Sequence, residues 1–177
     1  NSTLPWDIHS KGHKILVTGP TAASRTYLTG GWRGPWQGPP NEDDRLTSGS
    51  SVLTAVSSVA GLDVSYSCGT NILGGERDDD KSKQGVVEEV KGWVGLGPHN
   101  AVDRAVGVAK DADLVVVCVG EEAYTEKPGD IRSLRLPNGQ YELVRSLASE
   151  TDAKIVLVYF GGRPRLLGSM VEHVHAV

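Results

Sequence analysis

The segment 113–120, with the sequence DLVVVCVG, constrains the fold of this chain more than any other. Such a continuous apolar, β-branched run is typical of a central strand in a parallel sheet, covered on both faces. Lys14–Thr18 (KILVT) and Lys154–Phe160 (KIVLVYF) are similar runs of strand length, and residues 62–68 (LDVSYSC) alternate as a half-buried strand does. Residues 174–177 would begin a fifth strand.

Helical patterns lie between these strands. Residues 50–60 follow a serine-rich start. Residues 100–109 and 138–149 place apolar side chains at helical spacing, and Asn100 is a suitable N-cap for residues 100–109. Residues 166–171 would form one more short helix. Because strands alternate with helices, the pattern predicts a mostly parallel sheet with helices on both faces.

Two stretches interrupt the alternation. Residues 30–45 are too rich in glycine and proline for a helix or strand. Residues 69–97 are rich in glycine and charge, and we interpret them as a long surface excursion with one short helix near 86–91.

Composition excludes several classes of function. The chain has 177 residues, which suits one domain, and its net charge of −4 does not favour a nucleic-acid-binding face. It contains no apolar run of about 18 residues, so we expect no membrane span. Its cysteines, Cys68 and Cys118, are expected to be buried free thiols.

No cofactor is implied by the sequence. The histidines do not have metal-ligand spacing with carboxylates or cysteines, so we expect them to be surface or packing residues. They are His9, His13, His99, His173 and His175. Nucleotide-binding glycine motifs are also missing.

The ends of the chain suggest a fragment of a longer protein. The sequence begins at Asn1 without an initiator methionine and stops within the apolar run 174–177. Asn1-Ser2-Thr3 is an N-glycosylation sequon, which is weak evidence for secretion.

Two loops are the candidates for function, because ligands of doubly wound sheets bind beyond the carboxyl ends of the strands. The loop after Thr18 contains Trp32 and Trp36, whose flat faces suit sugar rings, and Gln37, which offers a donor and an acceptor to hydroxyls. The alternative is a structural role, in which the tryptophans anchor a long loop to the sheet.

The loop after Val119 gathers four carboxylates, Glu121, Glu122, Glu126 and Asp130. A solvated acidic loop is the ordinary explanation. A glycosidase, however, needs one carboxylic acid to protonate the leaving oxygen and a second carboxylate opposite it. Glu121 and Glu126 are the rival candidates for the acid.

Taken together, these motifs resemble the second domain of glycoside hydrolase family 3, which includes exo-β-glucanases and β-glucosidases. The matching segments occur in the family's order across nearly the whole chain. They are Ser2-Thr3-Leu4-Pro5, Ile15-Leu16-Val17-Thr18-Gly19-Pro20, Gly30-Gly31-Trp32, Trp36-Gln37-Gly38, the loop from Val119 to Asp130, Leu136-Pro137 with Gln140, and Gly162-Arg163-Pro164.

The resemblance implies a three-layer, flavodoxin-like (α/β)6 sandwich, here incomplete at its C-terminus and spanning residues 1–177. It implies that Glu126 is the general acid/base and that Trp32 and Trp36 clamp a glucosyl unit, with Gln37 beside them. Arg163 is expected to tie loops together rather than touch substrate. The excursion 69–97 is longer than the family pattern leads us to expect.

The resemblance also implies a parent enzyme. That parent is expected to be a retaining β-glucosidase or exo-β-glucanase, which removes glucosyl units from the non-reducing end of β-glucans or β-glucosides, and the sequon leads us to expect that it is secreted. The nucleophile is expected on a preceding (β/α)8 barrel, which this chain lacks, so no residue here is assigned that role and the fragment alone is expected to be inactive. Two alternatives remain open: a carbohydrate-binding or structural module without activity, and a signalling or interaction domain of flavodoxin type.

Overall fold

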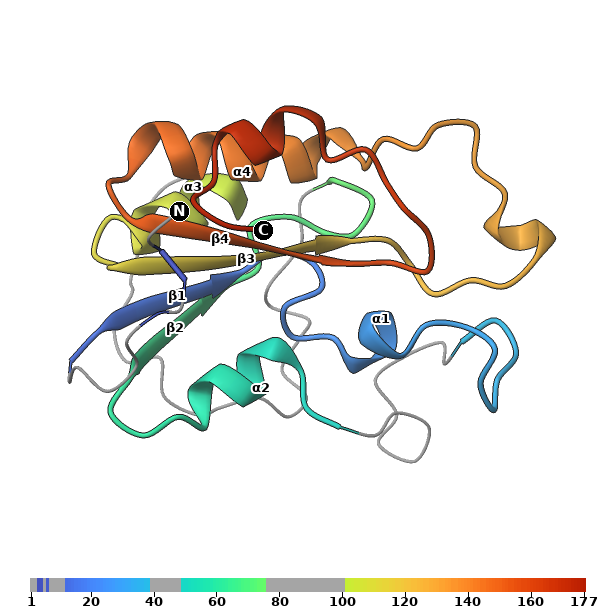
Figure 1. The fold of residues 1–177 in the computed structure, drawn as a ribbon, viewed down its shortest axis with the longest axis horizontal. Coiled ribbons are helices and arrows are strands. Elements are labelled where there is room, and N and C mark those ends of the chain that lie inside the picture. The colour runs from blue at the N-terminus through green and yellow to red at the C-terminus, as the bar shows by residue number, and fades with distance from the viewer. Residues whose placement is uncertain (1–2, 5, 7–11, 39–48, 76–100) are drawn as a thin grey trace.

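The computed structural model describes residues 3–4, 6, 12–38, 49–75 and 101–177. Figure 1 shows a parallel sheet between two layers of helices. In chain order the elements are β1 (Lys14–Thr18), α1 (Arg25–Thr29), α2 (Val52–Ser57), β2 (Asp63–Ser67), α3 (Ala101–Ala109), β3 (Leu114–Gly120), the 3₁₀ turn η2 (Lys127–Gly129), α4 (Asn138–Glu150), β4 (Lys154–Phe160) and the 3₁₀ turn η3 (Gly168–Glu172).

The four strands are all parallel and lie in the order β2-β1-β3-β4. The valine-rich β3 pairs with β1 on one side and β4 on the other, as its sequence predicts. The chain first moves outward from β1 to β2, then returns to add β3 on the opposite side of β1. The direction of winding therefore reverses between β1 and β3, and this reversal places helices on both faces.

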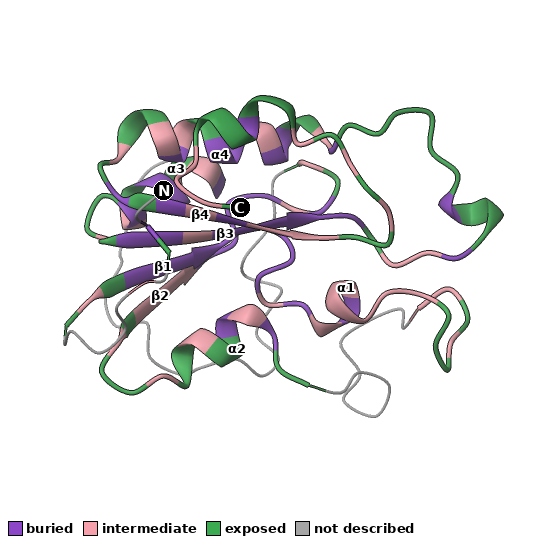
Figure 2. Cartoon of the chain, in the orientation of Figure 1, coloured by how far each residue is buried: buried purple, intermediate pink, exposed green. Residues whose placement is uncertain are grey.

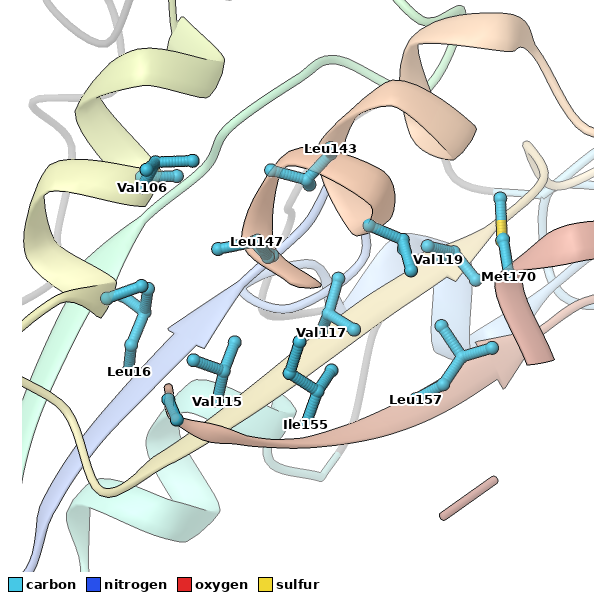
Figure 3. Close-up of a cluster of buried hydrophobic side chains, with 14 of the residues drawn as sticks. Leu16, Val106, Val115, Val117, Val119, Leu143, Leu147, Ile155, Leu157 and Met170 are labelled. Carbon is cyan, nitrogen blue, oxygen red and sulfur yellow. The ribbon is translucent and has the colours of Figure 1, made fainter. Parts of the chain in front are cut away.

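The larger core lies between the sheet and the pair α3 and α4 (Figure 3). From the sheet, β3 contributes Val115, Val117 and Val119, while the helical stripe of α4 contributes Leu143 and Leu147. These side chains are almost completely buried, so this contact supplies most of the hydrophobic stabilisation of this face.

A smaller core fills the opposite face, beneath β1 and β3. It is formed by Ile15 and Val17 of β1, Cys118 of β3 and Leu53 of α2. Ser51 caps α2, since its hydroxyl accepts a hydrogen bond from the backbone N–H of Thr54 at 3.1 Å. Figure 2 shows the buried residues concentrated in the strands and on the inner sides of the helices.

Most of the predicted elements are confirmed to within a few residues. The short helix predicted over 166–171 is present as the 3₁₀ helix η3, shifted to Gly168–Glu172, and Gly168 enters it with a φ of 55° that no α-helix accommodates. The fifth strand is reduced to one parallel bridge between Val156 and Ala176. The predicted helix near 86–91, most of the excursion 69–97 and the Asn100 cap lie outside the described residues.

The remaining expectations concern single residues. Cys68 and Cys118 are buried and form no disulfide, as predicted. His13 packs edge-on against Trp6, and the Nδ1 of His175 accepts a hydrogen bond from the backbone of Ile155, so both have packing roles. Among the described residues, no helix is long and apolar enough to cross a membrane, and His, Cys, Asp and Glu side chains do not gather in threes that could hold a metal ion.

Candidate functional site

The two candidate loops leave the sheet at the point where its winding reverses. The loop after β1 and the loop after β3 emerge from neighbouring strands, and the backbone N–H of Thr21 donates to the carbonyl of Cys118 at 3.4 Å. In Figure 1 both loops project beyond the same end of the sheet, with η2 near the far end of the second loop. This position is the usual ligand-binding edge of an open α/β sheet.

The tryptophans of the first loop face solvent. Trp32 is 66% exposed and Trp36 is 50% exposed, so neither ring pins the loop to the sheet. The rings contact each other edge to face, with centroids 6.0 Å apart and planes at 82°. The backbone N–H of Trp32 donates to the carbonyl of Trp36 at 2.9 Å, which closes the turn that presents both side chains.

Gln37 joins the first loop to the second. Its side-chain carbonyl accepts a hydrogen bond from the backbone N–H of Thr125 at 3.0 Å, across 88 positions of sequence. Close backbone contact reinforces this link, because a Cβ added to Gly31 would lie 2.2 Å from the carbonyl oxygen of Tyr124. The oxygen that was expected to meet substrate hydroxyls is therefore engaged within the protein.

Glu126 is exposed, next to the residue that Gln37 holds. Its backbone has φ 47° and ψ −142°, a conformation that costs a non-glycine residue about 1–3 kcal/mol. The 3₁₀ turn η2 follows immediately, and the N–H of Gly129 donates to the carbonyl of Glu126 at 2.8 Å. The loop therefore presents this carboxylate outward from a constrained backbone.

Glu121 has the opposite environment. The residue is only 9% exposed, and its Oε1 accepts a hydrogen bond from the N–H of Gly162 at 3.1 Å. Its Oε2 lies 3.4 Å from the Nε of Arg163 and forms a close ion pair with Arg165. A carboxylate whose oxygens are engaged by two arginines and a backbone N–H is not available to reach a glycosidic oxygen, so Glu121 is unsuited to donate a proton to substrate.

Two tyrosines complete the cluster around Glu121. The guanidinium of Arg163 lies over the ring of Tyr124, 3.7 Å from its centroid. Burial, followed by the Glu121 charge, raises the pKa of Tyr124 above its ordinary value, and Arg163 opposes that shift. Burial and then the same carboxylate raise the pKa of Tyr159 to about 12, and the Tyr159 hydroxyl donates to the carbonyl of Arg163 at 2.6 Å.

Arg163 has the loop-tying contacts that its position after β4 suggested, whereas Arg165 was missed. Arg165 donates from Nε to the carbonyl of Leu134 at 3.0 Å and from Nη2 to that of Arg135 at 2.5 Å, in addition to its ion pair with Glu121. No short motif identified Arg165, because its partners lie 30, 31 and 44 positions away in the sequence.

Gln140, part of the Leu136-Pro137 motif, supports the root of the second loop. Its completely buried side chain accepts a hydrogen bond from the N–H of Gly120 at 2.9 Å and donates to the carbonyls of Gly120 and Ile72. The last residue of β3 is thereby fixed immediately before Glu121.

Comparisons with known proteins identify the family of the chain. The family model described as "Glycosyl hydrolase family 3 C-terminal domain" matches residues 1–177. The chain is 31% identical over 171 residues to the lysosomal beta glucosidase of Dictyostelium discoideum, covering 94% of this chain and 18% of that protein. It is 30% identical over 176 residues to the periplasmic beta-glucosidase of Salmonella typhimurium, covering 99% of this chain and 21% of that protein.

Solved structures share the fold. A β-glucosidase involved in saponin metabolism from intestinal bacteria superposes with a TM-score of 0.68 at 23% identity, over 95% of this chain and 23% of that one. The Listeria innocua β-glucosidase in complex with glucose gives a TM-score of 0.63 at 21% identity, over 97% of this chain and 19% of that one. The chain thus spans about a fifth of the length of these relatives, and it belongs to the glycosyl hydrolase family 3 C-terminal domain family.

Proposed function

We propose that this domain supplies the general acid/base and part of the sugar-binding rim of a retaining β-glucosidase or exo-β-glucanase. The observation that carries the proposal is the position of Glu126: an exposed carboxylate on a constrained backbone, at the ligand-binding edge, in the loop that Gln37 joins to the loop of two exposed tryptophans. The names of the relatives, which are β-glucosidases, support β-glucosides as the substrate class.

Glu126 is favoured over Glu121 because the two carboxylates have different partners. Glu121 is committed to Arg163, Arg165 and the backbone of Gly162, whereas Glu126 extends into solvent where a substrate would lie. An acid must come within hydrogen-bond reach of the glycosidic oxygen, and only an exposed group can do so.

The proposed reaction has two steps. In the first, the protonated carboxyl of Glu126 donates its proton to the glycosidic oxygen as the C1–O bond breaks, while a carboxylate from another domain forms a bond to C1. In the second, the Glu126 carboxylate takes a proton from water as the water oxygen attacks C1, and the bond between C1 and the nucleophile breaks. The sugar is released with retention, and Glu126 is protonated again.

The geometry of the tryptophans refines the proposed clamp. Rings that meet edge to face at 6.0 Å leave no space for a pyranose between them. We therefore propose that Trp32 and Trp36 form an L-shaped platform, on which a sugar stacks against one ring and contacts the edge of the other. Trp32→Ala should raise the KM for a glucan oligosaccharide by about tenfold, because aromatic contacts contribute about 0.5–1.5 kcal/mol beyond the loss of buried area.

The parent enzyme is proposed to contain a preceding (β/α)8 barrel that carries the nucleophile. Retention requires the two carboxyl groups to lie only about 5–5.5 Å apart, so the second loop would reach across to that domain. The 177 residues alone are accordingly proposed to be inactive. Measurable hydrolysis of an aryl β-glucoside by the purified domain would contradict this statement.

Location outside the cytosol is also proposed. It is supported by the words "lysosomal" and "periplasmic" in the names of two relatives, and by the sequon at Asn1, which lies outside the described residues. Detection of a glycosylated Asn1 peptide by mass spectrometry of the native protein would support this location, and a fully unmodified peptide would count against the sequon's use.

The direct test of the function is Glu126→Gln in the full-length protein, measured beside Glu122→Gln. Both variants remove one exposed carboxylate from the same loop. Loss of the general acid should lower kcat/KM for an alkyl β-glucoside by about 10²–10⁴-fold, and the Glu122 control should stay within about threefold of the unmodified enzyme. Equal values for the two variants would refute the assignment.

A further inference from the structure

The Glu121 carboxylate is buried beside the proposed catalytic loop but has no part in the reaction described above. Burying a carboxylate is unfavourable unless its charge is paired, and here two arginines and one backbone N–H are devoted to it. All three partners, Gly162, Arg163 and Arg165, lie in the loop after β4, so the carboxylate holds that loop against the loop after β3.

Arg163 transfers this restraint to Tyr124. Its Nε faces the Oε2 of Glu121, and its guanidinium covers the Tyr124 ring at 3.7 Å. A planar guanidinium can make an ion pair at its edge and stack through its face at the same time, which the compact ammonium of lysine cannot do. The position of Arg163 over the ring therefore depends on the Glu121 carboxylate.

Tyr124 in turn closes the part of the loop that contains Glu126. The backbone of Gly129 lies directly against the ring, because a Cβ added there would be 2.2 Å from Cδ2 of Tyr124. Residues 125–128 therefore form a loop whose two flanking residues, Tyr124 and Gly129, are in contact. The hydrogen bond from Gly129 N–H to the Glu126 carbonyl tightens this turn.

We propose that Glu121 is a positioning residue, which fixes the carboxyl group of Glu126 through Arg163 and Tyr124. This inference rests on the proposed function of Glu126. A catalytic acid must be held within about 0.5 Å of its productive position, and a displacement of about 1 Å costs up to about 10²-fold in rate. The rigid chain from Glu121 to Gly129 provides that accuracy on a loop that otherwise faces solvent.

The test uses the full-length protein and two substrates that differ in their need for an acid. An alkyl β-glucoside has a poor leaving group that must be protonated, whereas 2,4-dinitrophenyl β-glucoside has a leaving group that departs without a proton. Glu121→Gln should lower kcat/KM for the alkyl substrate at least about tenfold and for the dinitrophenyl substrate less than about threefold. The matched control is Glu122→Gln, which alters the adjacent, exposed carboxylate.

A purely structural role for Glu121 predicts a different pattern. Partial unfolding lowers the concentration of active enzyme, and this reduces the rates with both substrates by the same factor. Equal losses for the two substrates would therefore overturn the proposal, as would equal behaviour of the Glu121 and Glu122 variants.

Two further variants keep the test decisive. Glu126→Gln is measured in parallel. If this variant loses kcat/KM equally with both substrates, the proposed function is wrong. If Glu126→Gln loses more with the alkyl substrate but Glu121→Gln does not, only the positioning role is overturned. Should Glu121→Gln not fold, Arg163→Lys replaces it, since it keeps every charge but loses the stacked geometry. Arg163→Lys should show the same preferential loss with the alkyl substrate, and an equal loss with both would overturn the proposal.

Discussion

The side-chain carbonyl of Gln37 accepts a hydrogen bond from the backbone N–H of Thr125 at 3.0 Å and so connects the tryptophan loop to the residue preceding Glu126. The two loops that the sequence identified separately thus form one unit. This unit stands where β1 and β3 end side by side.

The first prediction concerns this hydrogen bond. Gln37→Leu removes the acceptor and leaves the Thr125 N–H without its protein partner, so the free energy of unfolding should fall by about 1–3 kcal/mol. Gln37→Glu keeps an acceptor oxygen and should lose less than half as much. Urea unfolding of the three proteins measures the difference, and identical losses in the two variants would show that the bond is unimportant.

A second prediction concerns the close contact of the loops at Gly31. A Cβ at this position would collide with the carbonyl of Tyr124, so Gly31→Ala should destabilise the domain by about 1–3 kcal/mol. Gly34 lies in the same loop with nothing within 4 Å of an added Cβ, and Gly34→Ala should change stability by no more than about 0.5 kcal/mol. Melting temperatures distinguish the two, and a Gly31→Ala protein as stable as the Gly34→Ala protein would contradict the contact.

The strained backbone of Glu126 gives a third prediction. Glycine tolerates a φ of 47° without steric cost, so Glu126→Gly should raise stability by up to about 1 kcal/mol while activity is lost. Glu126→Gln keeps the strain and serves as the control for removal of the charge. If the Glu126→Gly protein has a lower melting temperature than the Glu126→Gln protein, the backbone strain does not affect stability as described.

Alkaline pH should destabilise the fold. Burial raises the pKa of the Cys118 thiol from 9.0 to about 12 and that of the Tyr159 hydroxyl from 10.0 to about 12. Between pH 9 and 12 the unfolded chain loses these protons before the folded chain does, so the free energy of unfolding falls as pH rises, and the full contribution of both groups is present below pH 9. In Cys118→Ala and in Tyr159→Phe, the urea concentration at the midpoint of unfolding should fall less steeply with pH over that range. Unchanged slopes would contradict the raised pKa values of these two groups.

The fold was largely predictable because its strands are so apolar. The valine-rich run in β3 is typical of a central strand, and the stripe of Leu143, Val144 and Leu147 is typical of one face of a helix. The short helix expected at residues 166–171 is present, but its 3₁₀ form and its shift to Gly168–Glu172 were not predictable, because only Met170 is buried there and Gly168 has a positive φ.

The site was less predictable, since its contacts join residues far apart in sequence. The motifs located both loops, but they could not separate Glu121 from Glu126, because the difference arises from two arginines that follow β4. Nor could they show that Gln37 binds the backbone of Thr125 instead of offering its carbonyl to a ligand. Side-chain packing between loops has no local sequence pattern.

The central claim, that Glu126 is the general acid/base, is tested most directly by azide rescue of Glu126→Gly in the full-length protein. With 2,4-dinitrophenyl β-glucoside the first step needs no acid, but the second step lacks a base to activate water. Azide is already a nucleophile and needs no base, so it should attack C1, break the bond to the enzyme nucleophile, accelerate turnover and yield β-glucosyl azide. Turnover unaffected by azide, with glucose as the sole sugar product, would contradict the assignment of Glu126.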